Sequence, residues 1–129
     1  MRDADRVPSH SWISIVPEKD WAHALNEFSA LHEGWLVSLD VVAPTLGVQP
    51  QIRELPLRGV TAESGPRGSA ITISAARFDG EQITHLIPSA THVRIERTNE
   101  GADVALEIES DEGLAAILRF KSTAVMSHR

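Results

Sequence analysis

The chain has 129 residues, of which 42% are apolar and 23% charged, an ordinary composition for one globular domain with its own core. Eighteen acidic residues against twelve basic ones give a net charge of -6, which opposes binding to phosphate backbones and anionic lipids. The absence of cysteine excludes disulfides, thiol nucleophiles and cysteine-ligated metals.

The sequence gives no indication of membrane insertion or export. Residues 1–6 lack the apolar run of a signal peptide, and no segment approaches the roughly 20 apolar residues that span a bilayer. We therefore expect a cytoplasmic protein with no membrane and no nucleic-acid partner. No motif indicates a cofactor.

The chain is predicted to form a single domain, 1–129. Residues 1–11 are polar and aperiodic and are expected to form an arm. Residues 12–120 are expected to form the folded core, and residues 121–129 an aperiodic tail.

A helix is predicted over residues 17–33. Pro17 suits the first position of a helix, and Gly34 suits the left-handed residue that ends one. Side chains that recur at three- and four-residue steps form one stripe, which we expect to face the core. This stripe consists of Trp21, Ala24, Leu25, Phe28, Leu31 and His32.

Apolar and polar residues alternate with a period of two from Trp35 onward, which indicates strands. The Asp-Gly pair at 79–80 favours a hairpin, residues 63–69 are expected to be a surface loop, and Pro88 is expected to end a strand. The predicted strands cover about residues 35–41, 48–63, 71–75, 83–87, 93–96, 104–108 and 114–120.

These elements predict an α+β fold, with one N-terminal amphipathic helix packed on a curved, mainly antiparallel sheet of about six strands. The connections are too short for parallel crossovers, so neighbouring strands must be antiparallel. Pro56, Gly59 and Pro88 are positions where the sheet could bend. Both an open curled sheet and a small closed barrel are compatible with this pattern.

The run EFSALHEGWLV at 27–37 resembles the most recognisable segment of an uncharacterised bacterial family, the domain of unknown function numbered fifty-three thirty-five. The likeness covers about residues 12–120. Because that family has no assigned activity, the resemblance implies no catalytic residue, cofactor or partner. The other features that agree are Pro17 with Trp21, the run LPLRGV at 55–60, and His85, Pro88 and Val93.

Three residues are candidates for binding a ligand. His32 lies on the buried stripe of the helix and close to its end, where it either fixes the helix to the sheet or faces a cleft. His85 shares the phase of two isoleucines of its strand, whereas His92 shares that of charged neighbours, so the pair matches no metal site. Trp35 could anchor a partner if its indole is exposed.

Acidic residues also gather on the polar face of the last three strands. Glu96, Glu107 and Glu109 are expected to lie opposite Arg94 and Arg97. Cross-strand ion pairs explain this pattern. A glycosidase carboxylate pair would also need a groove, which the sequence does not indicate.

The absence of a recognisable catalytic constellation favours a non-enzymatic module, which binds a protein partner or a second copy of itself through a sheet edge or an uncovered sheet face. The strand containing Pro56 is the expected edge. The alternative is a small-molecule or metal site, with catalysis allowed, between the helix C-terminus and the sheet, using His32 and His85. Nucleic-acid binding by a small barrel is a third reading, which the negative charge opposes.

Overall fold

The computed structural model describes residues 11–66 and 68–121. Residues 1–10 of the predicted arm and 122–129 of the predicted tail lie outside this part of the chain. The elements in chain order are strand β1 (Ser11–Val16), the 3-10 turn η2 (Glu18–Asp20), helix α2 (Trp21–His32), and strands β2 (Leu36–Ala43), β3 (Gly47–Gly65), β4 (Gly68–Ala76), β5 (Gln82–Thr98), β6 (Asp103–Ser110) and β7 (Ala115–Phe120).

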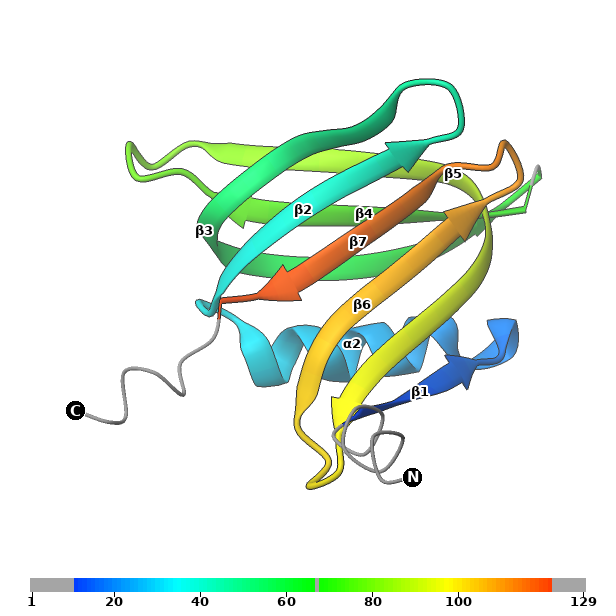
Figure 1. The fold of residues 1–129 in the computed structure, drawn as a ribbon, viewed down its shortest axis with the longest axis horizontal. Helices are drawn as coiled ribbons and strands as arrows, with labels where there is room; N and C mark the ends of the chain where they lie inside the picture. Colours follow the sequence, from blue (N-terminus) through cyan, green and yellow to red (C-terminus); the bar gives the residue numbers. More distant parts are fainter. Residues whose placement is uncertain (1–10, 67, 122–129) are drawn as a thin grey trace, which may run out of the picture.

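Six of the strands form a closed antiparallel barrel. The order β5-β4-β3-β2-β7-β6 returns to β5, and β1 pairs with β5 outside this ring (Figure 1). Every pairing among the described strands is antiparallel. The predicted α+β fold is therefore confirmed, and of the two architectures that the sequence left open the structure has the closed barrel.

Two long strands close the barrel by changing partners along their length. Strand β3 pairs with β2 as far as Pro56 and with β4 from Leu57 onward, while β5 passes from β4 to β6 at Ala90. Near these points Glu54 and Ser89 have positive φ angles of 54° and 52°, and the register shifts. Such bulges let one strand cross between two sheets that pack at a steep angle.

Three predicted boundaries were wrong. The α-helix does not begin at Pro17, because Glu18–Asp20 form a 3-10 turn and α2 begins at Trp21. Strand β5 does not end at Pro88, because the register shift between Ile87 and Ala90 leaves Pro88 and Ser89 outside the β4 pairing, so the missing N–H of proline costs no ladder bond. Residues 63–69 do not form an open loop, because β3 reaches Gly65 and β4 begins at Gly68, which makes a tight hairpin.

Helix α2 lies across one open side of the barrel, below it in the view of Figure 1. Trp21, Leu25, Phe28 and His32 of the predicted stripe are buried. Leu31 is 69% exposed, contrary to the prediction. Successive residues are rotated by about 100° around a helix, so Leu31 lies beside the contact face and not on it.

The second half of β3 has a free edge, which the helix covers. The Ser29 hydroxyl accepts a hydrogen bond from the Val60 N–H at 2.7 Å and lies 3.0 Å from the Val60 carbonyl oxygen. Beyond the helix end, the N–H of Gly34 donates to the Leu57 carbonyl at 2.8 Å. One serine thus provides the acceptor that a neighbouring strand would give the Val60 N–H.

The barrel interior is filled by aliphatic side chains from every barrel strand. The side chains that are almost completely buried are Leu25 of the helix and Val37, Leu39, Leu57, Val60, Ile71, Ile73, Val93, Leu106, Ile108 and Leu118 of the strands. In the described part of the chain, no helix is long and apolar enough to cross a membrane.

Candidate functional site

His32, the first candidate, is buried at the C-terminus of α2 among aromatic rings. Its ring centroid lies 4.7 Å from Phe28, 4.7 Å from Trp35 and 4.5 Å from Phe120. Its Nδ1–H donates to the Phe28 carbonyl, at 2.7 Å, in the last turn of the helix. The structure thus brings His32 and Trp35 together, with Trp35 half exposed at the rim of the cluster.

A short polar chain connects His32 to the sheet. Its Nε2 lies 3.4 Å from Oδ2 of Asp103 at the start of β6, and Nε of Arg97 donates to Oδ1 of Asp103 at 2.8 Å. The Arg97 guanidinium lies over the Trp12 ring, 5.6 Å from its centroid. Both nitrogens of His32 therefore have protein partners, and this arrangement fastens the helix end to β5 and β6.

His85 lies on another part of the barrel, on β5 opposite Ile73 of β4. Partial burial lowers the pKa of its imidazole below the usual 6.5. Among the described residues no hydrogen bond, ion pair or ring contact joins it to His32. The binding of a ligand by His32, His85 and Trp35 stays a prediction.

The hollows beside the helix differ in size, and the one lined by Trp21 and Ser69 among others has a volume of about 450 Å³. The one between α2 and the β5–β6 pair has a volume of about 90 Å³ and is lined by Glu27, Leu31, Arg97 and Asp103 among others. Ligand pockets usually measure about 300–1,000 Å³. Within the described residues no group of three or more His, Asp or Glu side chains is arranged to hold a metal ion.

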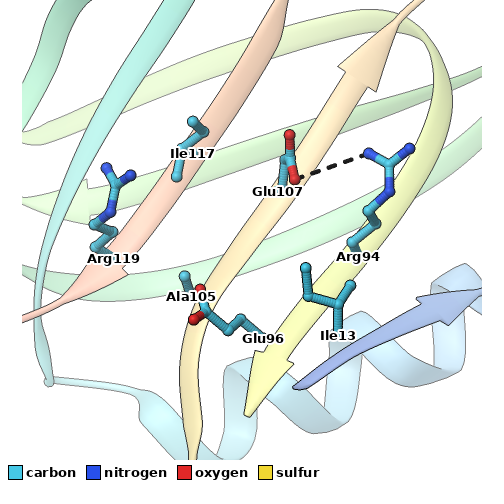
Figure 2. A pocket seen from close by; sticks show the side chains of 7 residues that line it. All are labelled: Ile13, Arg94, Glu96, Ala105, Glu107, Ile117 and Arg119. Carbon is cyan, nitrogen blue, oxygen red and sulfur yellow. Dashed lines mark ion pairs between the residues drawn. The ribbon is translucent and has the colours of Figure 1, made fainter. Parts of the chain in front are cut away.

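A second hollow lies on the outer face of the sheet formed by β1, β5, β6 and β7, and Figure 2 shows its lining side chains. Ala105 forms its floor, and the charged side chains around it alternate in sign. Its volume is about 130 Å³, so it suits a few side-chain atoms of a protein partner better than a separate small molecule. The lining residues are Ile13, Arg94, Glu96, Ala105, Glu107, Ile117 and Arg119.

The strand register explains this mixed surface. Ile13 lies opposite Glu96, which lies opposite Ala105. One row across the sheet therefore consists of an acidic side chain between two apolar ones. The next row begins with Ile15 and Arg94. Arg94 binds Glu109 at 3.0 Å and Glu107 at 3.8 Å, which confirms the predicted cross-strand ion pairs of Arg94. The expectation for Arg97 was wrong, because its guanidinium pairs with Asp103 instead.

Strand β1 forms the edge beside this hollow. In the described part of the chain it pairs with β5 alone, whereas each of the other strands has two or more partners. Ile13 and Ile15 point to the outer face and are 59% and 67% exposed. The strand sequence, SWISIV, carries no charge and no proline, which are the usual protections of an edge strand.

The sequence reasoning missed this strand. The edge was expected at Pro56, but β3 pairs there with β2, and helix α2 covers the edge that β3 leaves open from Leu57 onward. The signal for β1 was present in the run of β-branched and aromatic residues directly before Pro17. The predicted folded core begins at residue 12, but no strand is predicted before Pro17.

Comparisons with known proteins give one match. A family model described as a family of unknown function (DUF5335) matches residues 13–128. No curated protein and no solved structure matches the chain.

Proposed function

Because the chain belongs to the family of unknown function DUF5335, whose description assigns no activity, we propose a function from its surface. The domain is a non-enzymatic protein-interaction module that accepts an extended segment of a partner protein along the edge of β1 that no strand of the described residues covers. The observation that carries this proposal is the uncharged edge strand with Ile13 and Ile15 exposed. The proposed location of the module is the cytoplasm, and the lack of cysteine is compatible with this location.

Strand addition supplies both affinity and selectivity at such an edge. The backbone of the incoming segment would pair with the side of β1 that faces away from β5, and its alternate side chains would lie beside Ile13 and Ile15. The incoming strand lies next to the outer hollow, where Arg94 and Glu96 provide charges of both signs. A segment with alternating apolar residues therefore fits better than a uniformly charged one.

A fluorescent strand peptide tests this function. The probe alternates valine and threonine over seven residues and carries a lysine at each end for solubility. We expect saturable binding in the micromolar range by fluorescence anisotropy, because the contact is small. Hydrogen exchange should slow at the amides of β1 on binding.

Two controls separate strand addition from nonspecific attraction. A peptide with proline at its central positions lacks the required N–H groups and should not bind. Ile15→Lys should weaken the binding of the first peptide at least tenfold, whereas Val48→Lys, at an exposed apolar position of β3, should not. Equal binding of both peptides, or no saturable binding up to about 1 mM, contradicts the proposal.

A further inference from the structure

The edge of β1 has a sequence that suits pairing with itself. We propose that the preferred occupant is a second copy of this chain, joined through antiparallel pairing of the two β1 strands around a two-fold axis perpendicular to the sheet. This inference rests on the proposed function of β1 as an accepting edge, and it names the partner. Two-fold dimers are the commonest closed assemblies, and they need one self-complementary surface.

The register centred on Ser14 is the one that uses both exposed isoleucines. It places Ser14 opposite its own copy and Ile13 opposite Ile15 of the second copy. Directly opposed residues in antiparallel strands point to the same face, so the four isoleucines would form one apolar cluster on the outer face. Each isoleucine would lose part of the exposure of 59% or 67% that it has in the single chain.

The inner side of the same register is also apolar. Trp12, which is 46% exposed, would lie opposite Val16 of the second copy. Trp12 is already held in place, because its indole N–H donates to the Thr98 carbonyl at 3.1 Å and Arg97 covers its ring. A fixed, half-exposed indole loses little side-chain entropy when it gains a partner.

The charges beside β1 are compatible with this pairing. Glu96 is the β5 neighbour of Ile13, and Arg94 is the β5 neighbour of Ile15. A row across the joined sheets would therefore begin with Glu96, pass through two isoleucines and end with Arg94 of the second copy. Each row would thus have opposite charges at its two ends, and the two paired β1 strands carry no charged residue.

Sedimentation velocity over about 1–500 µM protein measures the association directly. We expect a monomer–dimer equilibrium with a micromolar dissociation constant, because a pair of six-residue strands makes a small interface. Raising the salt concentration should strengthen the dimer, since it screens the repulsion between two chains of net charge -6. A strictly monomeric protein over this range overturns the self-association.

Charge variants test the register. Ile13→Lys and Ile15→Glu should each weaken the dimer at least tenfold, because each places a charge opposite an isoleucine of the second copy. The double variant Ile13→Lys/Ile15→Glu should recover much of the association, since each new ammonium then lies opposite a new carboxylate of the second copy. Val48→Lys, with a similar exposure on β3, is the matched control and should dimerise like the unmodified chain.

The outcomes distinguish this inference from the proposed function. Thermal unfolding of each variant shows whether it is folded before its association is measured. If the single variants dimerise normally, or the double variant stays monomeric while folded, pairing of β1 in this register is wrong. A monomeric chain that still binds the valine–threonine peptide overturns only the self-pairing, whereas a chain that does neither overturns both.

Discussion

The hydroxyl of Ser29 is the most informative single group for testing how the helix closes the barrel. It lies 2.8 Å from the Leu25 carbonyl oxygen and accepts the Val60 N–H at 2.7 Å. Ser29→Ala would leave the N–H of Val60 unpaired at a partly buried position, where water reaches it poorly. An unsatisfied buried N–H costs about 1–3 kcal/mol, and we expect about 2 kcal/mol here.

This loss converts to a fall in the melting temperature. Unfolding entropy is about 2.1 cal/mol/K per residue, so for 129 residues a loss of 2 kcal/mol corresponds to roughly 7 °C. Calorimetry gives the melting temperature, and hydrogen exchange should show faster exchange at the Val60 amide. Ser74→Ala is the matched control, because among the described residues the Ser74 hydroxyl forms its side-chain hydrogen bond only with the exposed Thr84 hydroxyl, at 3.3 Å. A fall below about 2 °C, or an equal fall in the control, refutes the reasoning.

Three further changes have expected outcomes. Asp103→Ala should lower the free energy of unfolding by about 3 kcal/mol in urea, because it leaves the Arg97 guanidinium without its carboxylate partner. Asp40→Ala removes a more exposed ion pair and should lower it by no more than about 0.5 kcal/mol, so equal losses would contradict this expectation. Burial lowers the pKa of His85, so the unfolded chain takes up that proton first as the pH falls. Stability should therefore begin to drop as the pH falls through about 6.5, the usual pKa of the imidazole, and His85→Gln should reduce this drop, whereas an unchanged profile contradicts the assignment. Gly34→Ala should cost about 1 kcal/mol because φ is 88° there, and Gly34→Asn should cost less by the same urea measurement.

Local sequence rules were sufficient for most elements because their signals lie within a few residues. The stripe from Trp21 to Phe28 predicted a helix that ends before Gly34, and α2 has that position. Alternation with short turns predicted the meander of β5, β6 and β7, whose pairings the structure confirms. The predictions at Pro88 and at residues 63–69 were wrong for the same reason. Whether a strand continues through a bulge or into a tight turn depends on the strands beside it and not on local propensity.

The candidate surface was less accessible from the sequence. Whether Ile13 and Ile15 face the core or solvent depends on what lies across β1, and their spacing is the same in both cases. The interpretation of His32 as a residue that fixes the helix agrees with its backbone and Asp103 partners, but Asp103 is 71 positions away and has no periodic relation to it. Only tertiary folding brings side chains so distant in the sequence into contact.

The sequence by itself determined the helix, most of the strands and the composition of the core, because hydrophobic periodicity and turn residues act over short distances. Only the tertiary structure decided that β3 and β5 bend between two partners, that Ser29 covers the open edge of β3, and that β1 remains the edge of the sheet. The physical reason is that closure of a barrel is a property of pairings between distant segments, which fix the faces and edges that stay exposed.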